Sequence, residues 1–151
     1  MMRWTRFPPI FLVLCVAACS LLEKGAPPQV PAPPPVLAAP TLQGGQWTAF
    51  AIDGLAEVIS PKPSLRWMGP DHVDGSGGCN GFSAVAAPQG ANLRFANLRP
   101  VGKPCLTLPG AQEDRFFKAL ERARKVRFEG DAQLVLQDGD GQAVARFSRS
   151  P

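Results

Sequence analysis

The chain has 151 residues, of which 45% are hydrophobic, with 16 basic and 12 acidic side chains, 17 prolines, 4 cysteines and a single histidine. This length allows one ordinary domain with an unfolded appendage, and a mean hydropathy of −0.02 argues against a chain that is disordered throughout. A single histidine excludes multi-histidine metal sites, and only one Ser/His/Asp arrangement could be built, around His72.

Residues 1–18 predict a lipoprotein signal peptide. Arg3 and Arg6 form a basic head, and the apolar run that follows is shorter than the roughly 20 residues that a stable membrane span needs. The exit Val16-Ala17-Ala18-Cys19 resembles the lipobox of bacterial lipoproteins, which implies that Cys19 is acylated and becomes the first mature residue. Ser20, in place of an aspartate, favours the outer membrane. The alternatives are an ordinary cleaved signal with a chance cysteine and an uncleaved membrane anchor.

Cleavage also changes the charge of the chain. It removes two basic residues and lowers the formal net charge from +4 to +2. Because no stripe of interleaved basic and aromatic residues follows, we expect no nucleic-acid partner.

Residues 19–45 are predicted to be the lipidated cysteine and a proline-rich tether. Prolines occupy half of residues 27–40 and prevent a helix or a sheet ladder, because each fixes φ and lacks an N–H donor. In a polyproline II conformation such a segment could reach roughly 70 Å from a membrane. The alternative is a docking motif for a proline-recognising groove. We expect the folded domain to cover residues 46–151.

The folded part predicts short strands separated by turns. The expected strands are 47–52, 64–68, 79–87, 92–95, 126–128, 133–137 and 142–147. Gly130-Asp131 and Asp138-Gly139-Asp140-Gly141 are hairpin signals, and consecutive hairpins predict an antiparallel meander. The second turn resembles a fragment of a calcium loop but lacks the bidentate acid, so we interpret it as a turn. Trp67 and Met68 are expected in the core.

One segment, residues 111–125, has helical periodicity instead. Phe116, Ala119, Leu120 and Ala123 would share its apolar face. Glu113 and Asp114 are expected in the first turn and Arg122, Arg124 and Lys125 in the last, each opposing the helix dipole. We therefore expect a capped amphipathic helix, the alternative being a basic end that contacts lipid headgroups or phosphate.

Two cysteines, Cys79 and Cys105, remain in the exported domain once Cys15 leaves with the signal and Cys19 is acylated. An even remainder in an oxidising compartment predicts a Cys79–Cys105 disulfide, for which chain entropy gives roughly 3.5 kcal/mol of stabilisation. Two free buried thiols are the main alternative. A redox or metal site is less favoured, because no Cys-X-X-Cys spacing is present.

The glycine-rich stretch around Cys79 is interpreted as architecture. Gly75, Gly77, Gly78 and Gly81 permit unusual backbone conformations or close approach, and Asn80 can bond backbone groups of such a turn. A ligand-binding loop made by Asn80 and Ser76 is the alternative. The Gly-x-Ser-x-Gly spacing of a nucleophile elbow is not met, and His72 lies near Ser76 and Asp74 only along the chain.

These residues carry a resemblance to a known family. Trp47, the stretch Gly77-Gly78-Cys79-Asn80-Gly81-Phe82, Cys105, the helix around Glu113 and the strand Leu134-Val135-Leu136 together resemble the META domain family of HslJ-like proteins. The resemblance implies a small α+β domain with a strongly curved, barrel-like antiparallel sheet and one packed helix. It also implies an exported protein, often an envelope lipoprotein associated with stress, with no established catalytic activity and no cofactor.

The sequence thus predicts a non-enzymatic lipoprotein of the bacterial envelope. It would be lipid-anchored, facing the periplasm, and would bind an envelope partner or contribute to stress tolerance. The alternatives are a carrier of a small apolar ligand in a cavity of several hundred Å³ lined by the sheet, and a small hydrolase centred on His72.

Overall fold

The computed structural model describes residues 41–150, so the predicted signal peptide, Cys19 and most of the predicted tether lie outside the described residues. The described part contains one helix and eight strands. They are β1 (Gln46–Ile52), β2 (Ser64–Trp67), β3 (His72–Ser76), β4 (Gly81–Val85), β5 (Ala96–Val101), α1 (Leu108–Arg122), β6 (Lys125–Glu129), β7 (Gln133–Gln137) and β8 (Ala143–Ser150).

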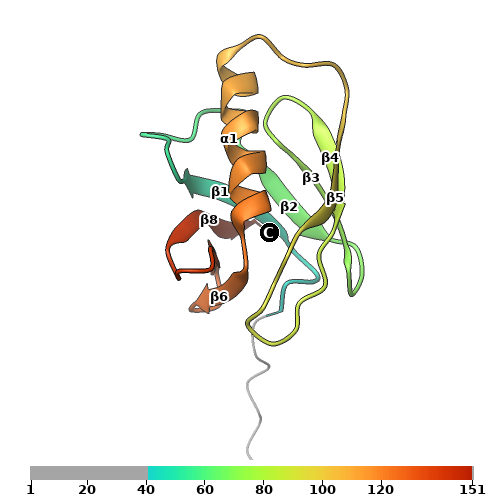
Figure 1. Cartoon of the computed structure of the whole chain (residues 1–151), viewed down its shortest axis with the longest axis vertical. Helices are drawn as coiled ribbons and strands as arrows, with labels where there is room; N and C mark the ends of the chain where they lie inside the picture. The colour runs from blue at the N-terminus through green and yellow to red at the C-terminus, as the bar shows by residue number, and fades with distance from the viewer. Residues whose placement is uncertain (1–40, 151) are drawn as a thin grey trace, which may run out of the picture. The chain divides into compact units, whose positions relative to one another are not determined.

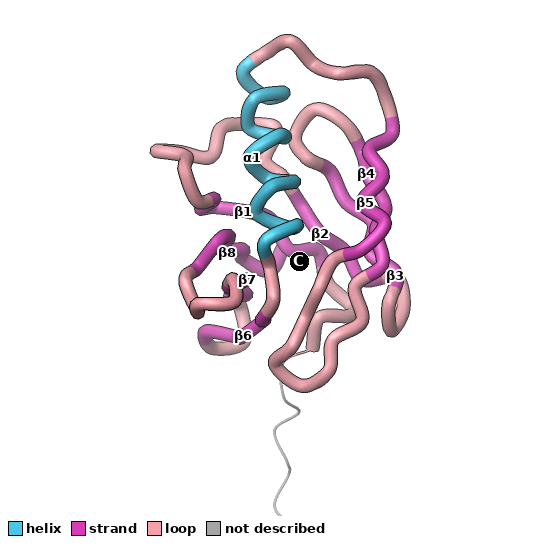
Figure 2. Tube along the Cα trace, viewed as in Figure 1, coloured by secondary structure: helices cyan, strands magenta, loops and turns pink. Residues whose placement is uncertain are grey.

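The strands form one antiparallel sheet built from two meanders. Its order is β5-β4-β3-β2-β1-β8-β7-β6, so the first and last strands of the domain pair with each other at the centre. α1 connects the two meanders, which extend on either side of it (Figures 1 and 2). The predicted α+β class and the antiparallel meander are confirmed.

The sheet is open, so the predicted barrel-like closure is not confirmed. β5 and β6 are the two ends of the strand order and do not pair with each other. The segment just before β5 comes close to doing so: Asn92 bridges Lys125, and the Val126 amide donates to the Ala91 carbonyl at 2.8 Å. These bonds to β6 come only from residues that precede β5, because β5 itself pairs with β4.

Three of the strands differ from the sequence prediction in position or length. β3 was not expected, because of its five residues only Val73 is buried. Residues 92–95 alternate as predicted, with Leu93 and Phe95 buried, yet they form an irregular segment, and the regular strand is β5, which follows. β4 is also shorter than the predicted 79–87, because Cys79 and Asn80 belong to the turn that precedes it.

The helix begins three residues earlier than predicted. Thr107 is its N-cap and accepts a hydrogen bond from the Gly110 amide at 3.4 Å, and Pro109 fits the first turn because its missing N–H has no helical partner there. The first turn therefore contains no acid, which corrects the placement of Glu113 and Asp114. Of the basic residues expected in the last turn only Arg122 lies there, since α1 ends at that residue.

The core lies between α1 and the centre of the sheet. α1 packs against β8 and β1, and its predicted face is buried: Phe116, Ala119 and Leu120 are at most 3% exposed. Phe147, from β8, is fully buried against Phe116, with the ring centroids 6.3 Å apart, and Trp47, from β1, is fully buried beside Phe128 of β6. Large aromatic side chains therefore fill the space between helix and sheet, where a carrier would need its cavity.

Trp67 belongs to this core as predicted, but Met68 does not. Trp67 is 3% exposed and its indole N–H donates to the Ala86 carbonyl at 3.1 Å, whereas Met68 is 58% exposed. Met68 follows the last residue of β2 and lies in the turn to β3, where the chain leaves the sheet.

Residues ahead of Gln46 also pack on the domain. Leu42 is buried, and its carbonyl accepts a hydrogen bond from the Trp47 indole at 3.0 Å. The Arg149 guanidinium lies 5.1 Å from the Trp47 ring centroid and donates to the carbonyls of Thr41 and Gln43. The last strand thereby holds the segment through which the chain enters the domain.

Candidate functional site

The glycine-rich stretch forms the tight turn between β3 and β4. The Ser76 hydroxyl accepts a hydrogen bond from the Gly78 amide at 3.1 Å, and the Gly77 amide donates to the Asn80 carbonyl at 2.8 Å. Gly78 has φ +107°, and a Cβ there would lie 2.7 Å from the Pro61 carbonyl oxygen. Only glycine fits this position, which supports the architectural interpretation of the stretch.

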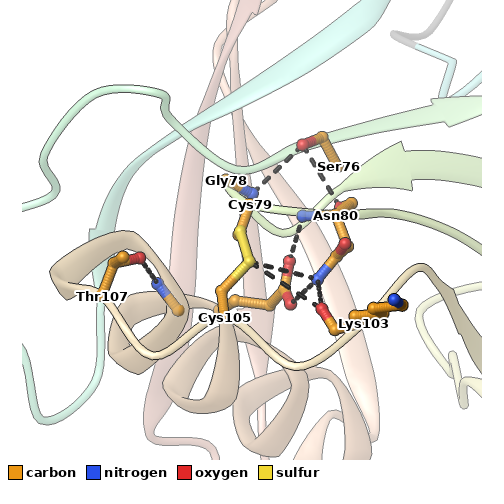
Figure 3. The surroundings of a disulfide bond; sticks show 9 residues. Ser76, Gly78, Cys79, Asn80, Lys103, Cys105 and Thr107 are labelled. Atoms are coloured by element: carbon orange, nitrogen blue, oxygen red, sulfur yellow. Dashed lines mark hydrogen bonds between the residues drawn. A yellow bond between two sulfur atoms is a disulfide. The ribbon is translucent and has the colours of Figure 1, made fainter.

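Asn80 joins this turn to the helix through Glu113. The Glu113 carboxylate accepts the Asn80 backbone amide at 2.6 Å with one oxygen and the Asn80 side-chain amide at 2.9 Å with the other (Figure 3). Glu113 is 6% exposed, although it is an acid on an amphipathic helix. A buried carboxylate is tolerated only where hydrogen bonds replace its hydration, and Asn80 supplies two of them.

The same asparagine also holds the loop between β5 and α1. Its side-chain amide donates to the Lys103 carbonyl at 3.1 Å and lies 3.6 Å from the Cys105 sulfur. Gly102, with φ +140°, packs so closely on the Asn80 side chain that a Cβ would overlap it. The predicted Cys79–Cys105 disulfide is present, with a Cα–Cα distance of 6.6 Å, and ties this loop to the turn covalently.

Gln112, the neighbour of Glu113, fastens a third segment. Its side-chain oxygen accepts the Ile59 amide at 2.8 Å, and its nitrogen donates to the carbonyls of Ile59 and Pro61 at 3.1 and 3.2 Å. Gln112 is 3% exposed, so these bonds are made in the protein interior. Residues Ile59, Pro61, Gly78, Cys79, Asn80, Lys103, Cys105, Gln112 and Glu113 are called the latch below.

Phe82 connects the latch to the apolar core. It is 3% exposed, and its ring lies 5.8 Å from that of Phe116 and 5.3 Å from that of Phe117, both in edge-on geometry. Gly81 begins β4 and pairs with Ser76, so the turn leads directly into a buried strand. The predicted motif residues Gly77, Gly78, Asn80, Gly81 and Phe82 are thus brought together with the disulfide.

The sequence prediction missed Gln112 and Glu113 as members of this cluster. Glu113 was assigned to the first turn of the helix, where its charge would oppose the helix dipole, and Gln112 was not singled out. Their spacing could have indicated their burial. Gln112 lies four residues before Phe116 and so shares its helix face, and Glu113 borders that face; both belong to the helix because it begins at Leu108.

His72 and Ser76 lie at opposite ends of β3 and have different partners. The His72 imidazole Nε2 lies 3.0 Å from an Asp74 carboxylate oxygen, and both side chains are about half exposed. The Ser76 hydroxyl bonds backbone groups of the turn. The three side chains therefore do not form a relay in which His72 contacts the serine.

The side chain of Asp138 closes the turn between β7 and β8, in agreement with the predicted hairpin turn. Asp138 accepts the amides of Gln142 at 2.9 Å and Asp140 at 3.1 Å, and Arg122 donates to its other oxygen at 3.1 Å. These bonds, led by the one from Gln142, hold the pKa of the Asp138 carboxyl below its usual range. Within residues 41–150 no three potential metal ligands gather at one place.

Several grooves open at the surface of the described domain. One of about 470 Å³ is lined by Val85, Leu93, Arg94 and Arg124 among others, and one of about 370 Å³ by Leu42, Val126 and Phe128 among others. Neither groove includes a latch residue. In the part of the chain that the structure describes, no helix is long and apolar enough to cross a membrane.

The fold and the latch define a class of small α+β domain, in which one antiparallel sheet packs on a single helix and a glycine-asparagine turn is bonded to that helix. The chain belongs to the META domain family, whose model matches residues 40–151. The resemblance inferred from the sequence is therefore confirmed.

Two solved structures share the fold. The NMR structure of a protein from Burkholderia xenovorans is 22% identical, with a TM-score of 0.56, and the match covers 82% of this chain and 98% of that one. A second NMR structure is 20% identical, with a TM-score of 0.55, covering 71% of this chain and 90% of that one. No curated protein matches the chain.

Proposed function

We propose that the protein is an exported lipoprotein of the bacterial cell envelope, anchored through acyl groups on Cys19 and facing the periplasm from the outer membrane. Several acyl chains would be needed, because each buried methylene contributes about 0.8 kcal/mol and one myristoyl-length chain binds a membrane only marginally. The part of the predicted tether that precedes residue 41 would link the acylated Cys19 to the META domain, because Leu42 is buried in that domain.

The Cys79–Cys105 disulfide is the observation that carries this proposal. Disulfides persist in exported proteins and are rare in the reducing cytosol. With these two cysteines paired, Cys19 is the remaining cysteine outside the apolar segment of the signal-like leader. The distribution of all four cysteines is therefore consistent with export and lipidation.

Within the envelope, we propose a binding or stress-tolerance role without catalysis. The polar groups of the latch are engaged by other groups of the same chain, as the Asn80–Glu113 and Gln112–Ile59 bonds illustrate. A catalytic centre needs polar groups directed at a substrate. The latch supports a rigid scaffold that presents its surface to an envelope partner.

The test is lipidation of the full chain in a bacterial host that processes lipoproteins. The parent protein should fractionate with membranes, incorporate labelled palmitate and yield an acylated N-terminal peptide beginning at Cys19. The Cys19→Ser variant should incorporate no label and yield no acylated N-terminal peptide, whatever its fractionation. Cys15→Ser is the matched control, because Cys15 precedes the cleavage site, and it should behave as the parent. An unmodified residue 19 in the parent would refute the anchor.

A further inference from the structure

The loop between β5 and α1 exposes large apolar side chains. Leu106 is 98% exposed, Leu108 78% and Val101 68%, the highest values among the exposed large hydrophobic residues of the described domain. Residues 101–108 are called the apolar loop below. In Figure 1 the loop arches from the end of β5 to the start of α1 at one end of the domain. Leucines held fully in water are typical of interaction sites when they cluster.

The latch fixes this loop, so the exposure of its leucines is built into the fold. The Lys103 carbonyl is bonded to Asn80, Cys105 is joined to Cys79, and Thr107 caps the helix (Figure 3). These three attachments are spaced along the loop and leave Leu106 and Leu108 on either side of the capping threonine. A ligand would therefore contact leucines that the fold already holds in the solvent, and the loop would lose little conformational entropy on binding.

The charge around the loop is positive. Residues 96–112 contain no acid and two bases, Arg99 and Lys103, both of them exposed. Arg99 and Val101 are two residues apart on β5 and so lie on the same face of that strand. The next acid along the chain, Glu113, is buried against Asn80, and the first exposed acid is Asp114, in the second turn of the helix.

We propose that the apolar loop docks on the surface of an anionic phospholipid bilayer. Leu106, Leu108 and Val101 enter the boundary between headgroups and acyl chains, while Arg99 and Lys103 contact the phosphates. A protein partner fits these observations less well, because protein interfaces are centred on aromatic, methionine or arginine anchors seated in pockets, and this loop is a protruding tip without an aromatic residue. The docking needs no acyl group on Cys19, so it can be tested separately from the anchor.

The test uses the chain from residue 19 onward with Cys19→Ser, which cannot be acylated, and its co-sedimentation with vesicles. We expect binding to vesicles of equal parts phosphatidylethanolamine and phosphatidylglycerol, and much weaker binding to phosphatidylcholine vesicles. Replacing both Leu106 and Leu108 by Ser should weaken binding at least about tenfold. Replacing Arg99 or Lys103 by Ala should weaken it about fivefold for each charge and reduce its dependence on salt.

Met68→Ser is the matched control. Met68 is also exposed, but it lies in the β2–β3 turn, at the opposite end of β3 from the turn that carries Cys79. It should bind like the parent. Circular dichroism and the retained disulfide would verify that each variant is folded. The proposal would be overturned if the parent did not bind anionic vesicles, or if the double leucine variant bound them as well as the parent. It would also be overturned if Met68→Ser lost as much binding as the double leucine variant. Self-association of the parent that is abolished by the leucine changes, without vesicle binding, would instead assign the loop to a protein interface.

Discussion

The two ends of this domain are held together in different ways. At the latch, three chain segments are fastened to the helix by buried polar side chains and a disulfide. In the β6–β8 meander, Leu134, Val135 and Leu136 are fully buried and the connecting turns are short hairpins. The stability of the latch thus depends on a few hydrogen bonds and one disulfide, and that of the β6–β8 meander on the burial of apolar side chains.

The two ends are expected to lose stability in different ways when contacts are removed. Apolar packing is non-directional and degrades gradually, whereas a buried polar group that loses its partner has the full cost of its desolvation left uncompensated. The latch also joins residues far apart in the sequence, since Asn80 and Glu113 have a sequence separation of 33. We therefore expect the latch to open as a unit, while the meander stays folded.

Removing the disulfide should have the largest effect. Replacing Cys79 and Cys105 together by Ser should lower the free energy of unfolding by about 3.5 kcal/mol, because the unfolded chain regains the freedom of a loop closed over a separation of 26 residues. Urea denaturation measures this change. Amide hydrogen exchange should rise most in residues 76–80 and 101–107, where local opening adds to it, and less in β6–β8, where it rises only through global unfolding. A uniform rise across the domain would contradict the separation of the two ends.

Breaking the polar part of the latch should come next. Glu113→Ala removes the acceptor of the Asn80 backbone amide and leaves the Asn80 side-chain amide with the Lys103 carbonyl, so it should lower the free energy of unfolding by about 3 kcal/mol. Glu113→Gln retains one acceptor and should cost less. Asp114→Ala, at the exposed neighbouring position, should change it by less than about 0.5 kcal/mol. If the alanine changes at 113 and 114 were equally mild, the buried carboxylate would have no structural role.

The sequence predicts the apolar end of the domain better than the latch. The strands 126–128, 133–137 and 142–147 were predicted because their alternation, and the Gly-Asp turns between them, are local signals. The buried face of α1 was predicted for the same reason, since Phe116, Ala119 and Leu120 recur at helical spacing. Each of these features depends on residues that are close in the chain.

The features that were missed depend on distant residues. β5 contains Pro100, and Asn97 has φ +53°, so its local pattern is unlike a strand and only pairing with β4 makes it one. Glu113 looks like an acid placed for the helix dipole, and only the fold brings the Asn80 turn to it. Asn80 itself was predicted to bond backbone groups of its own turn, whereas its side chain bonds the β5–α1 loop and the helix.

The smallest expected effect lies at the apolar end, in the β7–β8 turn. The pKa of Asp138 is lowered by the bonds from the Gln142 amide, Arg122 and the Asp140 amide, so its ionised form stabilises the folded state. This contribution is complete above the pKa of about 3.9 that an aspartate has in the unfolded chain, and it is lost as the pH falls through the lower folded value. The Asp138→Asn variant should therefore melt slightly below the parent at neutral pH and approach it in acid, as followed by circular dichroism. Asp131→Asn, in the exposed β6–β7 turn, should melt with the parent at neutral pH. A difference between Asp138→Asn and the parent that stays constant from neutral pH into acid would mean that the charge of Asp138 does not stabilise the turn, and that the apolar end is held by packing and turn geometry alone.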